Sequence, residues 1–216
     1  MRMTSHKSSV QTAAEGPVSA KEPKRKRGIA RVAKLLDAAA TVFAEQGYKA
    51  ATMTEIAAKA GAPIGSLYQF FPNKDVLADA LVAQYGEHVQ QALMRIREQA
   101  AELEAAALAD RLLDVFATHA AERSLVLSLL DARWEQPGVR PGVLRSRLRQ
   151  EIVLVLQSWC PSLAEEKAQV AAVVLLQAMK SLAQLIEEKR YPGKPEALEE
   201  WRIWVRAYLS DLARNH

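Results

Sequence analysis

The stretch TMTEIAAKAGAPIGSLYQFFPNK, residues 52–74, decides the fold of this chain. Thr52 can accept a hydrogen bond from an orphan backbone N–H, and Glu55, three residues on, can reach back, so the pair predicts the start of a helix. Gly61 ends that helix, because glycine adopts the left-handed turn most readily. A second short helix follows Pro63, with apolar residues at helical spacing. Two short helices joined by a tight turn predict a helix-turn-helix.

The second helix has one apolar side and one side of small or polar groups. Ile64, Leu67 and Phe71 lie on the apolar side, whereas Ser66 and Gln69 lie opposite them together with a glycine. Such a surface can approach a DNA groove closely. Gln69 has the donor and acceptor that match an adenine edge, and Ser66 can bond to a base or a phosphate. The pattern therefore favours a DNA-recognition helix.

At this residue-by-residue level the stretch resembles the DNA-binding motif of the TetR (tetracycline repressor) family. The matching residues are Thr52, Ile56, Ala57, Ala60, Gly61, Gly65, Ser66, Leu67, Tyr68, Phe71, Lys74 and Leu77. One position departs from the pattern, because Pro63 stands where the family often has Ser or Thr. Pro63 cannot cap through a side-chain oxygen or donate an N–H to a phosphate.

The resemblance implies a role for each motif residue at a major groove. Thr52, Tyr68 and Lys74 are expected at phosphates, Ile64, Ser66 and Gln69 at bases, and Gly65 allows close approach. The predicted DNA-binding residues of the motif are Thr52, Thr54, Pro63, Ile64, Gly65, Ser66, Tyr68, Gln69 and Lys74.

Residues 1–27 read as a disordered basic arm, because they are rich in Ser, Thr and Ala and lack periodicity. The arm ends in the run Lys24, Arg25, Lys26 and Arg27, and Arg31 and Lys34 follow. Such a run can neutralise phosphates or enter a minor groove beside the main motif. It can also be a solvated solubilising tail or a nuclear-localisation signal. Its position directly before the motif favours DNA.

Composition is consistent with a globular regulator. The chain has 216 residues, of which 50% are hydrophobic, a net charge of +4 and one cysteine. The positive charge permits a nucleic-acid partner, and a single cysteine suits a reducing compartment. No stretch approaches the roughly 20 uninterrupted apolar residues of a membrane span, and the N-terminus lacks an apolar signal core. We therefore expect a cytoplasmic protein without a membrane partner.

The periodicity predicts an all-α chain with two folded domains. Residues 28–74 form a three-helix helix-turn-helix domain, whose first helix runs from Ile29 to about Gln46. A long helix then runs from Asn73 past Ile96 and connects the domains. Residues 75–216 form a helical ligand-binding and dimerisation domain, with further helices expected over residues 103–121, 143–159, 162–188 and from Pro195 onward.

The last two of these helices carry more apolar surface than one small domain needs. Self-association of paired helices would bury both stripes, and the resemblance implies the same homodimer. The alternative is that both helices complete the core of a single chain. The predicted interface residues are Val174, Leu182, Trp201, Val205 and Tyr208.

The resemblance also implies a small-molecule effector bound between the middle helices. The predicted pocket residues are Phe116, His119, Trp134, Trp159 and Met179, for each of which ordinary core packing is the alternative. His119 and Glu122 are two possible metal ligands without a third, so no metal site and no cofactor are predicted. The chain also lacks the signatures of an enzyme.

Together these patterns predict a repressor released from a near-palindromic DNA operator by its effector. The alternatives are a helical protein-interaction module and a nucleoid-type DNA binder without a small-molecule ligand.

Overall fold

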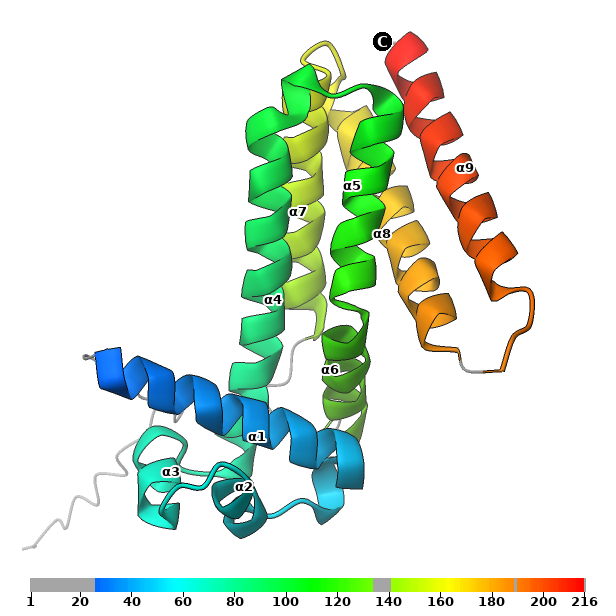
Figure 1. The fold of residues 1–216 in the computed structure, drawn as a ribbon. Helices are drawn as coiled ribbons and strands as arrows, with labels where there is room; N and C mark the ends of the chain where they lie inside the picture. The colour runs from blue at the N-terminus through cyan, green and yellow to red at the C-terminus, as the bar shows by residue number, and fades with distance from the viewer. Residues whose placement is uncertain (1–25, 134–140, 189, 216) are drawn as a thin grey trace, which may run out of the picture.

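The structure, a computed structural model, describes residues 26–133, 141–188 and 190–215. Helices alone make up the regular structure of these residues (Figure 1). The helices are α1 (Lys26–Ala50), α2 (Met53–Lys59), α3 (Ile64–Phe70), α4 (Lys74–Gln99), the short 3₁₀ helix η1 (Ala100–Glu102), α5 (Ala105–Thr118), α6 (Ala120–Ala132), α7 (Pro141–Trp159), α8 (Glu165–Glu187) and α9 (Lys194–Arg214). The all-α prediction is confirmed.

Helices α1, α2 and α3 form a small domain at one end of the molecule (Figure 1). The apolar stripe of α1, with Leu35 and Phe43, packs on Ile56 of α2 and Leu67 of α3, as expected. At Gly47 the backbone of α1 departs from helical geometry, with φ 78° and ψ 161°. A side chain would be strained at this φ, so glycine is what allows the chain to turn toward α2.

Helix α4 belongs to both domains. Its first turns carry Val76, Leu77 and Leu81 into the core of the small domain. Its later turns carry Tyr85, Val89 and other apolar side chains into the second core. The change of core falls between Leu81 and Tyr85, about two turns after the predicted boundary at residue 74. One continuous helix therefore connects the recognition motif with the second domain.

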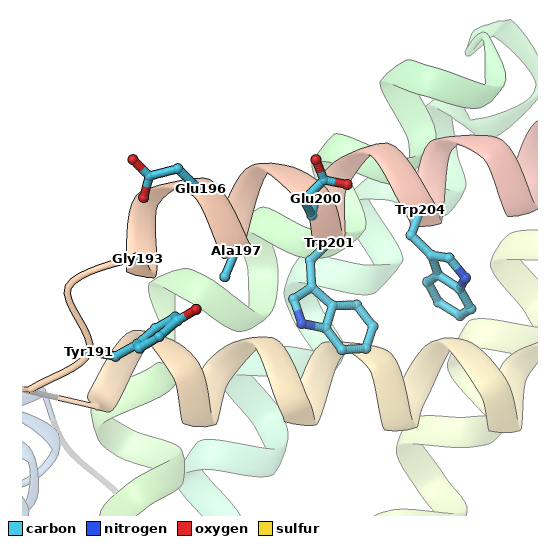
Figure 2. Close-up of a pocket in the computed structure, with 7 residues that line it drawn as sticks. All are labelled: Tyr191, Gly193, Glu196, Ala197, Glu200, Trp201 and Trp204. Atoms are coloured by element: carbon cyan, nitrogen blue, oxygen red, sulfur yellow. The ribbon is translucent and has the colours of Figure 1, made fainter.

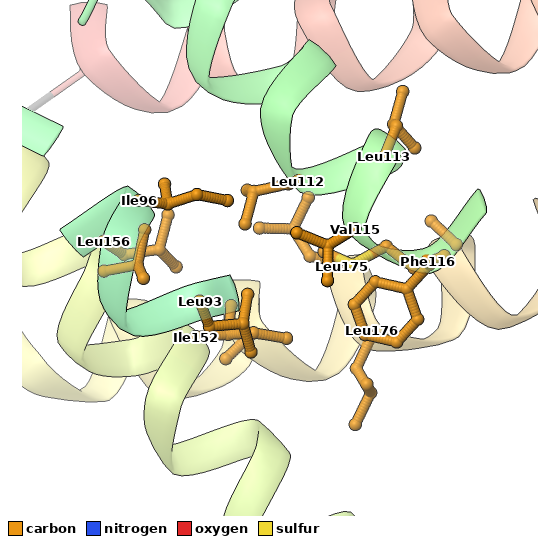
Figure 3. Close-up of a cluster of buried hydrophobic side chains, with 14 of the residues drawn as sticks. Leu93, Ile96, Leu112, Leu113, Val115, Phe116, Ile152, Leu156, Leu175 and Leu176 are labelled. Carbon is orange, nitrogen blue, oxygen red and sulfur yellow. The ribbon is translucent and has the colours of Figure 1, made fainter. Parts of the chain in front are cut away.

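The second core lies among α4, α5, α7 and α8, where Leu93, Leu112, Ile152 and Leu175 are buried together (Figure 3). The single helix predicted over residues 103–121 is wrong. The chain turns at His119, where φ is −100° and ψ is 17°, and the segment divides into α5 and α6. Helix α6 continues to Ala132, beyond the end of the predicted helix, and it packs against α1 as well as α8.

Helix α8 is long and apolar enough to cross a membrane by length and composition alone, with a mean hydropathy of 1.5. Its apolar character has another cause here. Leu175, Leu176 and Met179 are buried against the bundle, and a helix covered on several sides needs little polar surface. A core helix of this kind passes the same test.

Candidate functional site

Helices α2 and α3 are held by local contacts that the sequence specifies. The Thr52 hydroxyl accepts from the Glu55 N–H at 3.2 Å, and the Thr52 N–H donates to Glu55 Oε2 at 2.9 Å, which completes the predicted capping box. The Thr52 hydroxyl also donates to the Glu55 carboxylate, and this bond, together with the one from the Thr52 N–H, holds the pKa of Glu55 below its usual value. After α2, Gly61 at φ 57° donates to Ala58, and the Ala62 N–H donates to Ala57 O at 3.0 Å. These two hydrogen bonds close the C-terminal end of α2 and set the angle between α2 and α3.

Helix α3 presents most of its predicted contact residues to solvent. Gly65, Tyr68 and Gln69 are exposed, as are Pro63 and Ile64 at the start of the helix, while Leu67 is buried below them. Ser66 is half-buried and accepts a hydrogen bond from Arg31 at 3.3 Å. Pro63 makes no side-chain cap, as its chemistry requires. The exposed face of α3 therefore carries the amide of Gln69 and the phenol of Tyr68, and at Gly65 it has no side chain.

Lys74 does not present its ammonium to a phosphate in this structure. Its Nζ donates to the carbonyl oxygens of Tyr48 at 2.7 Å, Ala51 at 2.9 Å and Lys49 at 3.2 Å. The same Nζ lies 4.6 Å from the centre of the Tyr48 ring. Because a lysine has three donors, these contacts use all of them. Lys74 therefore ties the start of α4 to the end of α1.

Thr52 is occupied in a similar way. Its hydroxyl donates to Glu55 Oε2 at 2.7 Å in addition to its role as a cap. A phosphate offers only acceptors at neutral pH, so Thr52 has no side-chain donor left for one. Thr54, the second residue of α2, is exposed, and its hydroxyl has no hydrogen-bond partner among the residues that the structure describes.

Helix α3 contains no basic residue, but the first turns of α1 place three basic residues beside it. Arg27, Arg31 and Lys34 are exposed and line a cleft of about 290 Å³ against Gly61 and Pro63. These residues lie directly beside the start of α3. Of the predicted basic run, Lys24 and Arg25 lie outside the described residues, as does the side chain of Lys26.

Comparison with known proteins identifies the motif. Residues 35–81 match the family of bacterial regulatory proteins called the tetR family. Residues 35–81 therefore carry the DNA-binding motif of the TetR family. The chain is 38% identical to an uncharacterized HTH-type transcriptional regulator, YxaF, of Bacillus subtilis over 70 residues. These residues make up 32% of this chain and 37% of that protein. The chain is 46% identical over 52 residues to the HTH-type transcriptional repressor KstR2 of Rhodococcus jostii, 24% and 26% of the two chains. The chain thus spans well under half the length of these curated relatives.

Solved structures extend the likeness to the whole TetR-family fold. GusR of Salmonella enterica superposes with a TM-score of 0.61 at 22% identity, over 89% of this chain and 100% of that one. A TetR-family member from Streptomyces coelicolor gives a TM-score of 0.61 at 19% identity, over 84% and 97%. At such identities the fold alone is shared.

The predicted dimer residues fall into two groups. Leu182 and Val205 are buried in the core of their own chain, so their side chains have almost no surface left for a partner. They occupy the inner stripes of α8 and α9, which face each other and α5. Val174, Trp201 and Tyr208 are half-buried.

The outward stripes of α8 and α9 remain apolar. Val170 is 61% exposed on α8, and Ile203 and Trp204 are 48% and 45% exposed on α9. Trp204 lies edge-on to Trp201 and stacks on Tyr208 at 5.8 Å between ring centres. An open groove of about 690 Å³ runs along the start of α9, between Tyr191, Trp201 and Trp204 (Figure 2).

A smaller cavity of about 140 Å³ lies inside the second domain. Of the predicted pocket residues that the structure describes, Phe116 lines this cavity, whereas His119, Trp159 and Met179 do not. Met179 is fully buried in the core, and Trp159 donates from Nε1 to the Leu103 carbonyl at 2.9 Å beside a separate cavity. Trp134 lies outside the described residues. The polar groups of the cavity are Tyr85, Arg123, Arg145 and Lys180, which the sequence prediction missed.

One signal in the sequence pointed to Arg123. It shares a face of α6 with Ala120 and Val126, both buried, so a charged residue stands at an apolar position of the helical period. A charge at such a position is buried and calls for a partner.

His119 is bonded to a neighbouring side chain within the chain. Its Nδ1 lies 3.3 Å from Glu122 Oε1, while His88 Nδ1 of α4 lies 3.0 Å from Glu122 Oε2. Ligand atoms of the three residues lie within 4.8 Å of one another. The ground for predicting no metal was the lack of a third ligand, and His88 supplies one. As it stands, Glu122 joins α4 to the joint between α5 and α6.

The two domains also meet at Arg133, the C-terminal cap of α6. Arg133 is 3% exposed, and it donates to Asp75 Oδ1 at 3.2 Å and Asp79 Oδ1 at 2.8 Å, both on α4. Its guanidinium lies 5.5 Å from the centre of the Tyr48 ring, and the Tyr48 hydroxyl donates to Asp75 at 2.5 Å. One polar cluster therefore joins α1, α4 and α6.

Proposed function

We propose that this chain is a sequence-specific DNA-binding transcriptional regulator that acts in the cytoplasm as a homodimer and leaves its operator when a small molecule binds. The observation that carries the proposal is the geometry of α3. Its exposed face holds Gln69 and Tyr68 above a buried Leu67, and Arg27, Arg31 and Lys34 lie beside it. Base readout by an amide, with cations along the flanking phosphates, is the usual division of work at a DNA interface.

Each predicted contact residue is assigned to bases or to phosphates according to the hydrogen-bond donors that its side chain still has free. Gln69, Ser66 and Ile64 meet bases, Gly65 allows close approach, and Tyr68 and Thr54 reach phosphates. Arg31 and Lys34 take the phosphate role first expected of Lys74 and Thr52, whose donors are bonded within the chain.

The test is selection of bound sequences from a random DNA pool. Gln69→Ala should relax the preference at one base pair of each half-site, costing roughly 1–3 kcal/mol there. Arg31→Ala is the matched control, because it should weaken binding to every sequence alike and reduce the salt slope by about one. Recovery of no sequence preference by the parent protein would reject specific recognition and favour a nucleoid-type binder. Absence of any DNA binding would favour a protein-interaction module.

A second copy is the proposed occupant of the outward faces of α8 and α9. Exposed apolar side chains lie on both helices, with Val170 and Val173 on one and Ile203 and Trp204 on the other. Paired with their symmetry mates, the two helices would form a four-helix contact with a self-complementary face. A dimer also places two recognition helices at the half-sites of a near-palindrome.

Trp204→Glu tests this arrangement. A charge at the centre of an apolar contact should convert the dimer to a monomer at micromolar concentration, as measured by light scattering. Operator affinity should fall with it, since each half-site is then bound alone. The control is Val143→Glu, which places the same charge on an exposed apolar residue of α7. A Trp204→Glu protein that stays dimeric would reject this interface.

A further inference from the structure

The cavity of the second domain combines apolar walls with a cluster of positive charge. Seven apolar side chains line it, contributed by α5, α6, α7 and α8. Three cations line it as well, namely Arg123 of α6, Arg145 of α7 and Lys180 of α8. Acidic side chains are missing from the lining within the described part of the chain.

Arg123 is the most constrained of the three. Its side chain is 8% exposed, so more than nine-tenths of it is buried. Among the described residues its guanidinium has neither a hydrogen-bond acceptor nor an ion-pair partner, although it carries five donors. Burial lowers the pKa of Arg123, which expresses the cost of holding this charge away from water. A buried charge without compensation is rare unless a ligand supplies the opposite sign.

The neighbouring charges do not compensate Arg123. Among the residues that the structure describes, Lys180 donates to Gln177 Oε1 alone, at 3.0 Å. Burial lowers the pKa of Lys180, and Arg145, Arg123 and Arg149 lower it further. Arg149 itself has a buried Nε without a partner in the described residues. Glu122, a nearby acid, is held by His88 and His119 instead.

Tyr85 adds a neutral donor to the same wall. Burial raises the pKa of Tyr85 to about 12, although the charge of Arg123 acts in the opposite direction. The phenol therefore keeps its proton at any physiological pH. A proton donor and three cations that converge on one apolar cavity match the two oxygens of a carboxylate.

We propose that this cavity binds a small organic carboxylate with an apolar body about the size of a benzene ring, and that this anion is the effector. The volume of about 140 Å³ sets the size, since an apolar cavity of about 150 Å³ holds benzene. The carboxylate pairs with Arg123 and accepts from Tyr85, and the body packs against the apolar walls. The effector role rests on the proposed function, whereas the binding site does not.

The apolar walls distinguish a carboxylate from inorganic phosphate. A phosphate carries more charge and no apolar surface, so it would leave the leucine side chains without a partner and lose its own hydration. A monoanion with an apolar body satisfies both parts of the lining.

Calorimetry on the full chain without DNA tests the site. The probes are benzoate and hexanoate, with benzamide as the uncharged analogue of benzoate and inorganic phosphate as the anion without an apolar body. We expect the two carboxylates to bind and to raise the melting temperature, and benzamide to bind at least about tenfold more weakly. The proposal is overturned if benzamide binds as well as benzoate, if phosphate binds better than both carboxylates, or if neither carboxylate binds at millimolar concentration.

Arg123→Met separates a binding role from a structural one. Methionine keeps the apolar stem and removes the unpaired charge, so the unliganded variant should melt at the same temperature as the parent or higher. Its affinity for benzoate should fall at least about tenfold. Arg95→Met, the same change at an exposed site of α4, is the control and should alter neither property. A variant that melts lower and still binds benzoate would show that Arg123 supports only the fold.

A DNA arm separates the site from the proposed function. Benzoate should release the parent protein from its selected operator and should not release Arg123→Met. Benzoate binding without release would overturn the effector role. If the parent binds benzoate but selects no DNA sequence, the carboxylate site stands and the proposed function fails.

Discussion

Two buried arginines at the two ends of α6 differ in how their charge is neutralised. Arg133, at the C-terminal end, is 3% exposed and bonds to Asp75 and Asp79 of α4. Arg123, at the N-terminal end, is 8% exposed and has no acidic partner among the described residues. The first charge is satisfied by the chain itself and stabilises the contact between domains. The second is left for a molecule from outside.

The comparison predicts opposite effects for the same substitution. Arg133→Met should lower the free energy of unfolding by about 2–3 kcal/mol, because it removes two charge-assisted hydrogen bonds and the contact with the Tyr48 ring. The loss is smaller than for a pair buried on both sides, since Asp75 and Asp79 keep access to water. Urea unfolding monitored by circular dichroism measures it.

Arg123→Met in the same urea titration supplies the contrast, with an unfolding free energy equal to or above that of the parent. If both variants lost similar stability, the distinction between a structural and a ligand-binding arginine would fail.

The pH dependence of stability at Tyr85 tests the N-terminal end of α6, where Arg123 has no acidic partner among the described residues. Its pKa is 10 in the unfolded chain and about 12 in the folded one, so its contribution to stability is complete below pH 10 and is lost as the pH rises toward 12. Between these values the parent should lose about 1.4 kcal/mol per pH unit relative to Tyr85→Phe. Urea unfolding of both proteins at pH 9 and pH 11 measures the difference.

A constant difference between the two proteins across that range would mean that the phenol of Tyr85 is not buried beside the cavity.

The sequence predicted the two ends of the molecule unequally. The helix-turn-helix was predictable because its determinants are local: Thr52 and Glu55 cap one helix, and Gly61 turns the chain into the next. Contacts between distant helices were not predictable in this way. Lys74 matched the motif of a phosphate ligand, but its distance to the Tyr48 carbonyl depends on how α1 bends at Gly47.

The cavity shows the same limit. Tyr85, Arg123 and Lys180 stand 38 and 57 positions apart along the chain, and only the packing of α4, α6 and α8 brings them together. The periodicity of α6 marked Arg123 as misplaced, and Lys180 interrupted the most apolar helix. Neither of these two sequence patterns indicated that Arg123 and Lys180 line the same cavity. Similarly, Leu182 and Val205 belonged to apolar stripes, but the sequence did not tell which stripe faced the chain's own core.

The smallest change in the free energy of unfolding is expected at Asp79, the more exposed of the two acids that bond to Arg133. Asp79 is 63% exposed and Arg133 3%, so their bond at 2.8 Å joins a solvated carboxylate to a buried guanidinium. Asp79→Asn should lower the free energy of unfolding by only about 0.5 kcal/mol, because water screens the acid and Asp75 still neutralises Arg133. A double-mutant cycle with Arg133→Met measures the coupling directly. A coupling near zero would leave Asp75 as the partner that keeps Arg133 buried, whereas a coupling as large as the whole Arg133→Met effect would assign the domain contact to Asp79 alone.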